Sequence, residues 1–176
     1  MQGALLIGRG DTEHGTAMIM GVLQKMKEER QNVVATSVAC WLADGLTTGG
    51  RFEEALSILR NARGNAVRRG EAVFLPELLR LHARALLYMS QSNEARAVRM
   101  LLRSCRIARR QSATSWELRS TMTLARIRAQ HGDSEQARNL LAPIYGRFTE
   151  GFATHDLQAA SQLLREIDPR AAREAV

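Results

Sequence analysis

Four arginine side chains could together bind an acidic group. Arg80 and Arg84 stand one helical turn apart, and Arg119 and Arg126 are two turns apart further along the chain. A guanidinium group is a planar fork that can bind a carboxylate through two parallel hydrogen bonds. These arginines therefore indicate a site for an acidic peptide or for the carboxylate of a chain terminus.

The other residue types that carry chemistry are scattered. The four histidines show neither an H-x-x-x-H spacing nor a histidine–carboxylate cluster, so we expect no metal site. The two cysteines have no C-x-x-C spacing, and we expect buried thiols. The alternative for Cys105 is that neighbouring arginines lower the pKa of its thiol. There is no Gly-x-x-x-x-Gly-Lys-Ser/Thr phosphate loop, and the sequence predicts neither an enzyme nor a bound cofactor.

A second group of arginines forms a stripe on one helix, in a chain whose net charge is +7. Steps of three and four residues relate Arg96, Arg99, Arg103, Arg106 and Arg110. Such a stripe can contact phosphates, so a basic helical nucleic-acid-binding protein is the alternative function. No aromatic side chains alternate with these arginines, and nucleic acid is not the partner that we expect.

Small residues recur at a period of 40 to 42 and indicate helical hairpins. In four pairs, the second small residue follows the first by 12 positions. The pairs are Gly3 with Gly15, Ala43 with Ala55, Ala83 with Ala95, and Ala125 with Ala137. Two antiparallel helices joined by a tight turn approach closely only where their side chains are small. The spacing therefore predicts successive pairs of antiparallel helices.

These pairs define the predicted elements. We expect helices over residues 1–8, 11–29, 32–48, 51–69, 73–90, 92–110, 113–131, 133–150 and 155–167. They form a half repeat (1–30), three repeats (31–70, 71–111 and 112–151) and a capping helix (154–168), followed by a tail (169–176). The predicted fold is one all-α domain over 1–168, a right-handed, TPR-like (tetratricopeptide) α-α superhelix of helical hairpins. Its period exceeds the usual 34 residues, so each helix is nearly a turn longer.

In stacked hairpins the first helix of each pair lines the concave face. The register of the small residues predicts which polar and apolar positions point into it. These are Asp44, Glu77, Arg80, Arg84, Tyr88, Arg119, Met122, Arg126 and Gln130. The alternative is that the arginines are solvated, with some of them paired to Glu77 or Glu117. We expect a protein-interaction module that binds a protein or peptide, which could be acidic, on this face.

Pro143 interrupts the second helix of the last hairpin. Proline inside a helix removes a hydrogen bond and clashes with the preceding turn, so we expect a kink there. The kink would turn Tyr145, Phe148 and Phe152 toward the helix at 155–167, which would close the hydrophobic core. Gly151 would allow the chain to reverse.

Three short runs in the last repeat carry a family resemblance. They are Ser-Trp-Glu-Leu-Arg at 115–119, Leu-Leu-Ala-Pro at 140–143 and Phe-Thr-Glu-Gly-Phe at 148–152. The stretch from Ser112 to Leu164 resembles the C-terminal, TPR-like part of large bacterial signalling proteins, and the rest of the chain does so more weakly. Such proteins carry an adenylate or guanylate cyclase domain or a winged-helix DNA-binding domain, then a predicted ATPase and the repeat array. The resemblance implies a signalling or regulatory setting, and we expect this sequence to correspond to the array alone.

The predicted array begins with half a hairpin. We therefore expect either a longer gene product or a detached array whose open N-terminal hairpin another chain covers, for example in a homodimer. We expect no signal peptide, and the apolar runs fall short of the roughly 20 residues that a membrane span needs. We expect a cytoplasmic protein without a membrane partner.

Overall fold

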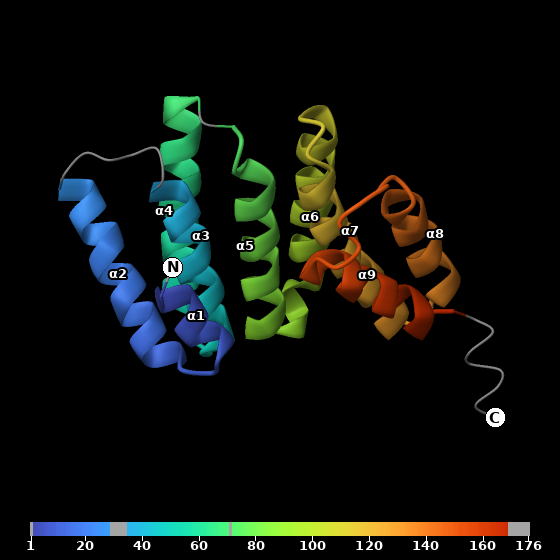
Figure 1. Cartoon of the computed structure of the whole chain (residues 1–176), viewed down its shortest axis with the longest axis horizontal. Helices are drawn as coiled ribbons and strands as arrows, with labels where there is room; N and C mark the ends of the chain where they lie inside the picture. Colours follow the sequence, from blue (N-terminus) through green and yellow to red (C-terminus); the bar gives the residue numbers. More distant parts are fainter. Residues whose placement is uncertain (1, 29–34, 71, 169–176) are drawn as a thin grey trace. The chain divides into compact units, whose positions relative to one another are not determined.

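The computed structural model describes residues 2–28, 35–70 and 72–168 (Figure 1). Within these ranges the protein is all-helical and contains no β-strand. The helices are α1 (Gln2–Gly8), α2 (Thr12–Glu28), α3 (Ala35–Thr48), α4 (Phe52–Arg69), α5 (Leu75–Met89), α6 (Glu94–Arg110), α7 (Thr114–Gln130), α8 (Ser134–Tyr145) and α9 (His155–Glu166), with a short 3-10 helix, η1 (Gln91–Asn93), before α6. The predicted all-α class is confirmed. The tail at 169–176 lies outside the described residues.

The chain divides into two compact units, Met1–Met100 and Leu101–Val176. The single domain predicted over 1–168 stays a prediction. In the first unit, α1 packs on α2 and α3 packs on α4. The helix α3 also contacts α1, α2 and α5, so first helices of successive hairpins lie against one another. In the second unit, α7 packs on α8, and both contact α9.

The ends of α4 show why the chain forms a helix there. Glu53 and Glu54 lie in its first turn, and Arg68 and Arg69 lie in its last, where the helix dipole favours these charges. Gly70 then adopts a left-handed conformation (φ 69°), and its N–H bonds to carbonyls of the last turn. This pattern of charges followed by glycine ends the helix where the sequence predicts.

The small residues occupy close contacts, with one correction. Gly3 and Gly15 pack so tightly that a Cβ added to Gly15 would lie 2.6 Å from the carbonyl oxygen of Gly3. Alanines 43, 55, 83, 125 and 137 are fully buried. Ala95 is instead exposed, and Ala97 is the fully buried residue. The prediction for Ala95 is wrong because η1 delays the start of α6 to Glu94, which shifts the buried position by two residues.

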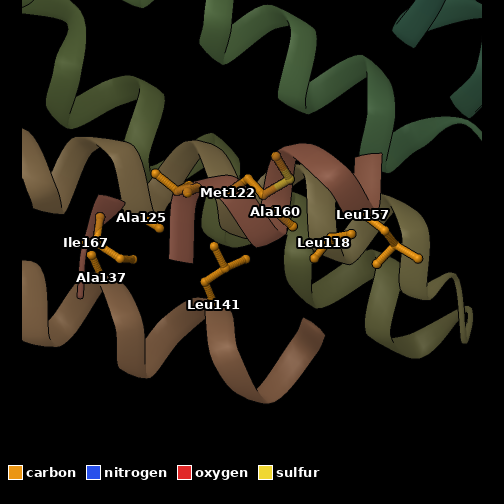
Figure 2. Close-up of a cluster of buried hydrophobic side chains, with 9 residues drawn as sticks. Leu118, Met122, Ala125, Ala137, Leu141, Leu157, Ala160 and Ile167 are labelled. Carbon is orange, nitrogen blue, oxygen red and sulfur yellow. The ribbon is translucent and has the colours of Figure 1, made fainter. Parts of the chain in front are cut away.

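A cluster of apolar side chains holds the second unit together (Figure 2). Its members come from α7, α8 and α9 and the residue that follows α9: Leu118, Met122, Ala125, Ala137, Leu141, Leu157, Ala160, Leu163 and Ile167. The helix α9 therefore packs against this core. Ser104 of α6 also forms a buried hydroxyl–hydroxyl hydrogen bond of 2.7 Å with Ser120 of α7.

The helix that contains Pro143 is shorter than predicted. It ends at Tyr145 rather than near residue 150, and the chain leaves through turns at 146–148. Pro143 lies inside the helix, two residues before its end, where it removes one hydrogen bond to the preceding turn. Tyr145 and Phe148 pack against the buried cluster. Phe152 is half exposed, and its ring meets that of Tyr145 edge to face at 6.1 Å. Gly151 reverses the chain with φ 77°.

Candidate functional site

Glu77 and Arg80 form an ion pair within the first turns of α5. The guanidinium group of Arg80 donates two hydrogen bonds of 2.8 Å to the carboxylate of Glu77. Both side chains are largely buried. The carboxylate of Glu77 therefore already occupies the guanidinium group of Arg80. For this arginine, the structure agrees with the alternative prediction of an ion pair with Glu77.

Arg84 connects α5 to α3. Its guanidinium group donates a hydrogen bond to the carboxylate of Asp44 and another, of 3.3 Å, to the hydroxyl of Thr48. The same group lies over the ring of Tyr88, 5.5 Å from its centre, in a cation–π arrangement. Three of the predicted site residues, Asp44, Arg84 and Tyr88, are thus brought together.

Trp41 is an exposed aromatic residue on the same helix as Asp44, and it was not among the site residues predicted from the sequence. Trp41 precedes Asp44 by three residues on α3, so the two share one face of the helix. Its exposed fraction is 46%, and that of Tyr88 is 62%. Aromatic residues form only 5% of the chain, so the position of Trp41 one turn before Asp44 could have indicated from the sequence that it belongs to the site. We name Trp41, Asp44, Arg84 and Tyr88 the α3–α5 surface.

The thiol of Cys40 lies next to this surface but is buried. Burial, followed by the carboxylate of Glu77, raises the pKa of Cys40 to about 12, against a smaller lowering by Arg80. The thiol therefore stays protonated at neutral pH. In the second unit the pKa of Cys105 is also raised, chiefly by burial, although a bond with Thr121 and the charge of Arg109 oppose the rise. The arginines near Cys105 thus do not produce a low pKa.

The predicted site residues of α7 lie in different environments. Arg119 donates a hydrogen bond of 2.6 Å to Asp156 of α9. Met122 belongs to the buried cluster of Figure 2, so its predicted place on an open face is wrong. The reason is that α9 packs against this side of α7. Arg126 and Gln130 are exposed.

Glu117 is a buried carboxylate that forms ion pairs in the second unit. Its side chain has no exposed surface, and it accepts a bond of 2.9 Å from Arg109 of α6 and one of 2.7 Å from Arg147, which follows α8. Arg147 also donates a hydrogen bond of 3.5 Å to the hydroxyl of Thr114. Two arginines neutralise one carboxylate, so this cluster ties α6, α7 and the segment after α8 together.

Side chains that could ligate a metal do not cluster in the part of the chain that the structure describes. There, no group of three or more His, Cys, Asp and Glu side chains could hold a metal ion. None of the described helices is both long and apolar enough to cross a membrane.

The five arginines of the predicted stripe on α6 are all exposed. The α3–α5 surface combines aromatic rings with an ion pair, which suits recognition of another chain.

Comparison with known proteins adds no assignment. No protein-family model matches the chain. No curated protein and no solved structure gives a significant match either.

Proposed function

We propose that this chain is a TPR-like interaction module that binds a segment of a partner protein on the α3–α5 surface. The observation that carries the proposal is the exposed pair of aromatic rings, Trp41 and Tyr88, joined by the ion pair of Asp44 and Arg84. Tryptophan, tyrosine and arginine are the residue types that contribute most to binding energy at protein interfaces.

The helix contacts support a superhelical arrangement of the first unit. In stacked hairpins each first helix packs on the first helix of the next hairpin, and α3 has such contacts with both α1 and α5. Close glycine and alanine positions, such as Gly3 and Gly15, let the helices of one hairpin approach. A right-handed TPR-like solenoid accounts for both features.

The segment that fits this surface has an acidic residue next to an apolar one. The ion pair of Asp44 and Arg84 is partly exposed, and pairs of this kind contribute only about 0.2–1 kcal/mol. A carboxylate of the partner can therefore replace Asp44 at the fork of Arg84 at little cost. Trp41 and Tyr88 then offer apolar area to the neighbouring side chain of the partner.

Fluorescence of Trp41 can test this proposal. The change Trp116→Phe leaves Trp41 as the single tryptophan of the chain. Peptides of equal length, with an aromatic or leucine anchor and either acidic or basic flanks, are titrated into this variant. We expect saturable changes in emission with acidic peptides only. Unchanged emission throughout, or no difference between acidic and basic peptides, would contradict the proposal.

Matched variants locate the binding. We expect Trp41→Ala and Arg84→Ala each to weaken peptide binding about tenfold or more, as truncated interface anchors do. The control Val67→Ala removes an exposed apolar side chain from α4, and Arg106→Ala removes an exposed arginine from α6. Neither control should change affinity. If duplex DNA binds with an affinity that falls steeply with salt, and peptides do not bind, the basic nucleic-acid binder is the correct function.

The biological setting rests on the resemblance of Ser112 to Leu164 to bacterial signalling proteins. Within such a protein, the module would recognise a neighbouring domain or a separate partner and would itself perform no chemistry. A cytoplasmic location and a homodimer through the N-terminal hairpin belong to the same proposal. Light scattering of the purified chain reports its mass, and a monomer at all concentrations would remove the homodimer.

A further inference from the structure

The exposed face of α6 carries five arginines at the spacing of a heptad repeat. Steps of three, four, three and four residues relate Arg96, Arg99, Arg103, Arg106 and Arg110, and each of them is exposed. With 3.6 residues per turn, these positions lie within about 80° of the helix circumference and extend over about 21 Å along the helix axis. They form one narrow row of positive charge, which we name the α6 stripe.

The packing of α6 on α7 fixes the direction of the α6 stripe. The hydroxyl groups of Ser104 and Ser120 form their hydrogen bond on the side of α6 that faces α7, and the sulfur of Cys105 lies 3.6 Å from the hydroxyl oxygen of Thr121 on the same side. Leu101 also lies there and has no exposed surface. The arginines of the α6 stripe lie on the opposite side of the helix, so their guanidinium groups are available to a partner.

The charge of the α6 stripe is not neutralised by any carboxylate among the residues that the structure describes. Within those residues, none of the five arginines forms an ion pair, whereas Arg109, which lies outside the stripe, pairs with Glu117. The helix has a single acidic residue, Glu94, in its first turn. Like charges one turn apart destabilise a helix, so the stability of α6 does not explain the row of arginines.

We propose that the α6 stripe binds an acidic helix of a partner protein whose carboxylates have the same heptad spacing. A guanidinium group pairs with a carboxylate through two parallel hydrogen bonds. Two helices have the same rise per turn, so carboxylates at steps of three and four residues meet the successive arginines in one register. The α6 stripe shares no residue with the α3–α5 surface, and this proposal does not rest on the function proposed for that surface.

Two features of α6 favour a protein partner over nucleic acid. Leu102 lies next to Arg99 and Arg106 on the helix surface, three and four residues away, and its exposed fraction is 49%. An apolar side chain of a partner protein can pack on Leu102, whereas a phosphate group gains nothing from it. The helix contains no aromatic residue, so the bases of a single strand would find no ring on which to stack. The partner helix therefore carries an apolar residue beside its row of carboxylates.

Fluorescence anisotropy of labelled helical peptides tests the α6 stripe. One peptide places five glutamates at steps of three and four residues in a background of alanine and leucine, and a control peptide of the same composition distributes them around the helix. We expect the wild-type protein to bind the control about tenfold more weakly. The double variant Arg103→Gln, Arg106→Gln should weaken binding of the first peptide about tenfold, whereas Arg60→Gln with Arg128→Gln, which removes two exposed arginines of α4 and α7, should not. Equal binding of the two peptides, or unchanged binding in the Arg103→Gln, Arg106→Gln variant, would overturn the proposal.

A charge reversal tests whether the side chains pair in register. The variant Arg103→Glu, Arg106→Glu should lose binding of the glutamate peptide. A peptide with its three central glutamates changed to lysine should bind this variant more tightly than it binds the wild-type protein. Circular dichroism shows whether the variant is folded, and the comparison of the two peptides on the wild-type protein needs no variant. If the lysine peptide does not prefer the folded variant, the proposed pairing is wrong.

Two further titrations separate this proposal from the other functions considered. If labelled duplex DNA binds more tightly than the glutamate peptide at equal salt, and Arg103→Gln with Arg106→Gln removes that binding, the α6 stripe binds nucleic acid and the proposal is refuted. The change Arg84→Ala, which weakens binding at the α3–α5 surface, should leave the affinity for the glutamate peptide unchanged. Loss of that affinity in Arg84→Ala would place the peptide on the α3–α5 surface and would exclude the α6 stripe as its site.

Discussion

Arg84 on α5 donates a hydrogen bond to Asp44 on α3, and the two residues are 40 positions apart in the chain. This separation equals the spacing of Ala43 and Ala83, the residues that precede them. The ion pair therefore joins equivalent positions of two successive hairpins, which is the relationship expected where first helices pack side by side.

A double-mutant cycle on Asp44→Ala and Arg84→Ala measures the strength of this pair. Both side chains are partly exposed, so we expect a coupling of about 0.2–1 kcal/mol in the free energy of unfolding. The coupling should weaken in high salt because the charges are accessible to ions. Urea unfolding of the four proteins gives the value, and a coupling near zero at low salt would mean that the pair does not form in solution.

The buried Glu117 predicts an asymmetry between its partners. Removing both arginines with Arg109→Ala and Arg147→Ala leaves a buried carboxylate without a counter-charge, and we expect a loss of about 3–5 kcal/mol. The change Glu117→Gln keeps the shape and leaves only the partly exposed arginines, so a smaller loss of about 1–2 kcal/mol is expected. Urea unfolding of each variant checks the order. If Glu117→Gln is the more damaging change, the carboxylate is not buried as described.

Two glycines of α2 provide a matched comparison of helix packing. A Cβ at Gly15 would collide with the backbone of Gly3, whereas a Cβ at Gly21 would meet no atom within 4 Å. We expect Gly15→Ala to destabilise by about 1–3 kcal/mol through overpacking. Gly21→Ala should stabilise by roughly 0.5–1 kcal/mol, because alanine favours helix more than glycine does. Thermal unfolding compares the two, and equal effects would show that α1 does not pack on α2 in this way.

His82 of α5 makes stability depend on pH. Its side chain is buried, and burial, followed by the charges of Arg63, Arg96 and Arg60, lowers its pKa from the reference value of 6.5 to about 4 in the folded protein. The unfolded chain therefore binds the proton more readily. The stability is therefore complete above pH 6.5 and falls as the pH decreases toward 4, by up to about 3 kcal/mol. Unfolding curves across this range measure the loss. His82→Gln should flatten the curve between pH 6.5 and 4, and an unchanged slope would assign the titration to other groups.

Much of the helix pattern was readable in the sequence because its causes are local. Apolar residues at helical spacing, acidic residues in first turns and glycines after last turns act within a few residues of one another. The end of α4 at Gly70 is an example. The register of α6 was misread because η1 depends on a turn at Ser90, whose hydroxyl accepts a hydrogen bond from the N–H of Ser92. Serine forms such turns in many contexts.

The candidate site could be predicted only in part. Asp44 and Arg84 were placed on the same face by the repeat, but Trp41 was missed because exposure depends on neighbours that the pattern does not reveal. Met122 was misplaced for a related reason. The helix α9 was expected to close the core, yet only its packing against α7 shows that it covers Met122 and pairs Asp156 with Arg119.

The sequence by itself determines the helices, because they depend on backbone hydrogen bonds between residues close in the chain. It also determines where small residues let the helices of a hairpin approach, as at Gly3 and Gly15, because that depends on short-range sterics. The tertiary structure decides which carboxylate each arginine contacts. It also decides that the Nε2 atom of His82 has no hydrogen-bond partner among the described residues. Long side chains reach across to other helices, and burial changes the energy of a charge far more than its neighbours in the chain do.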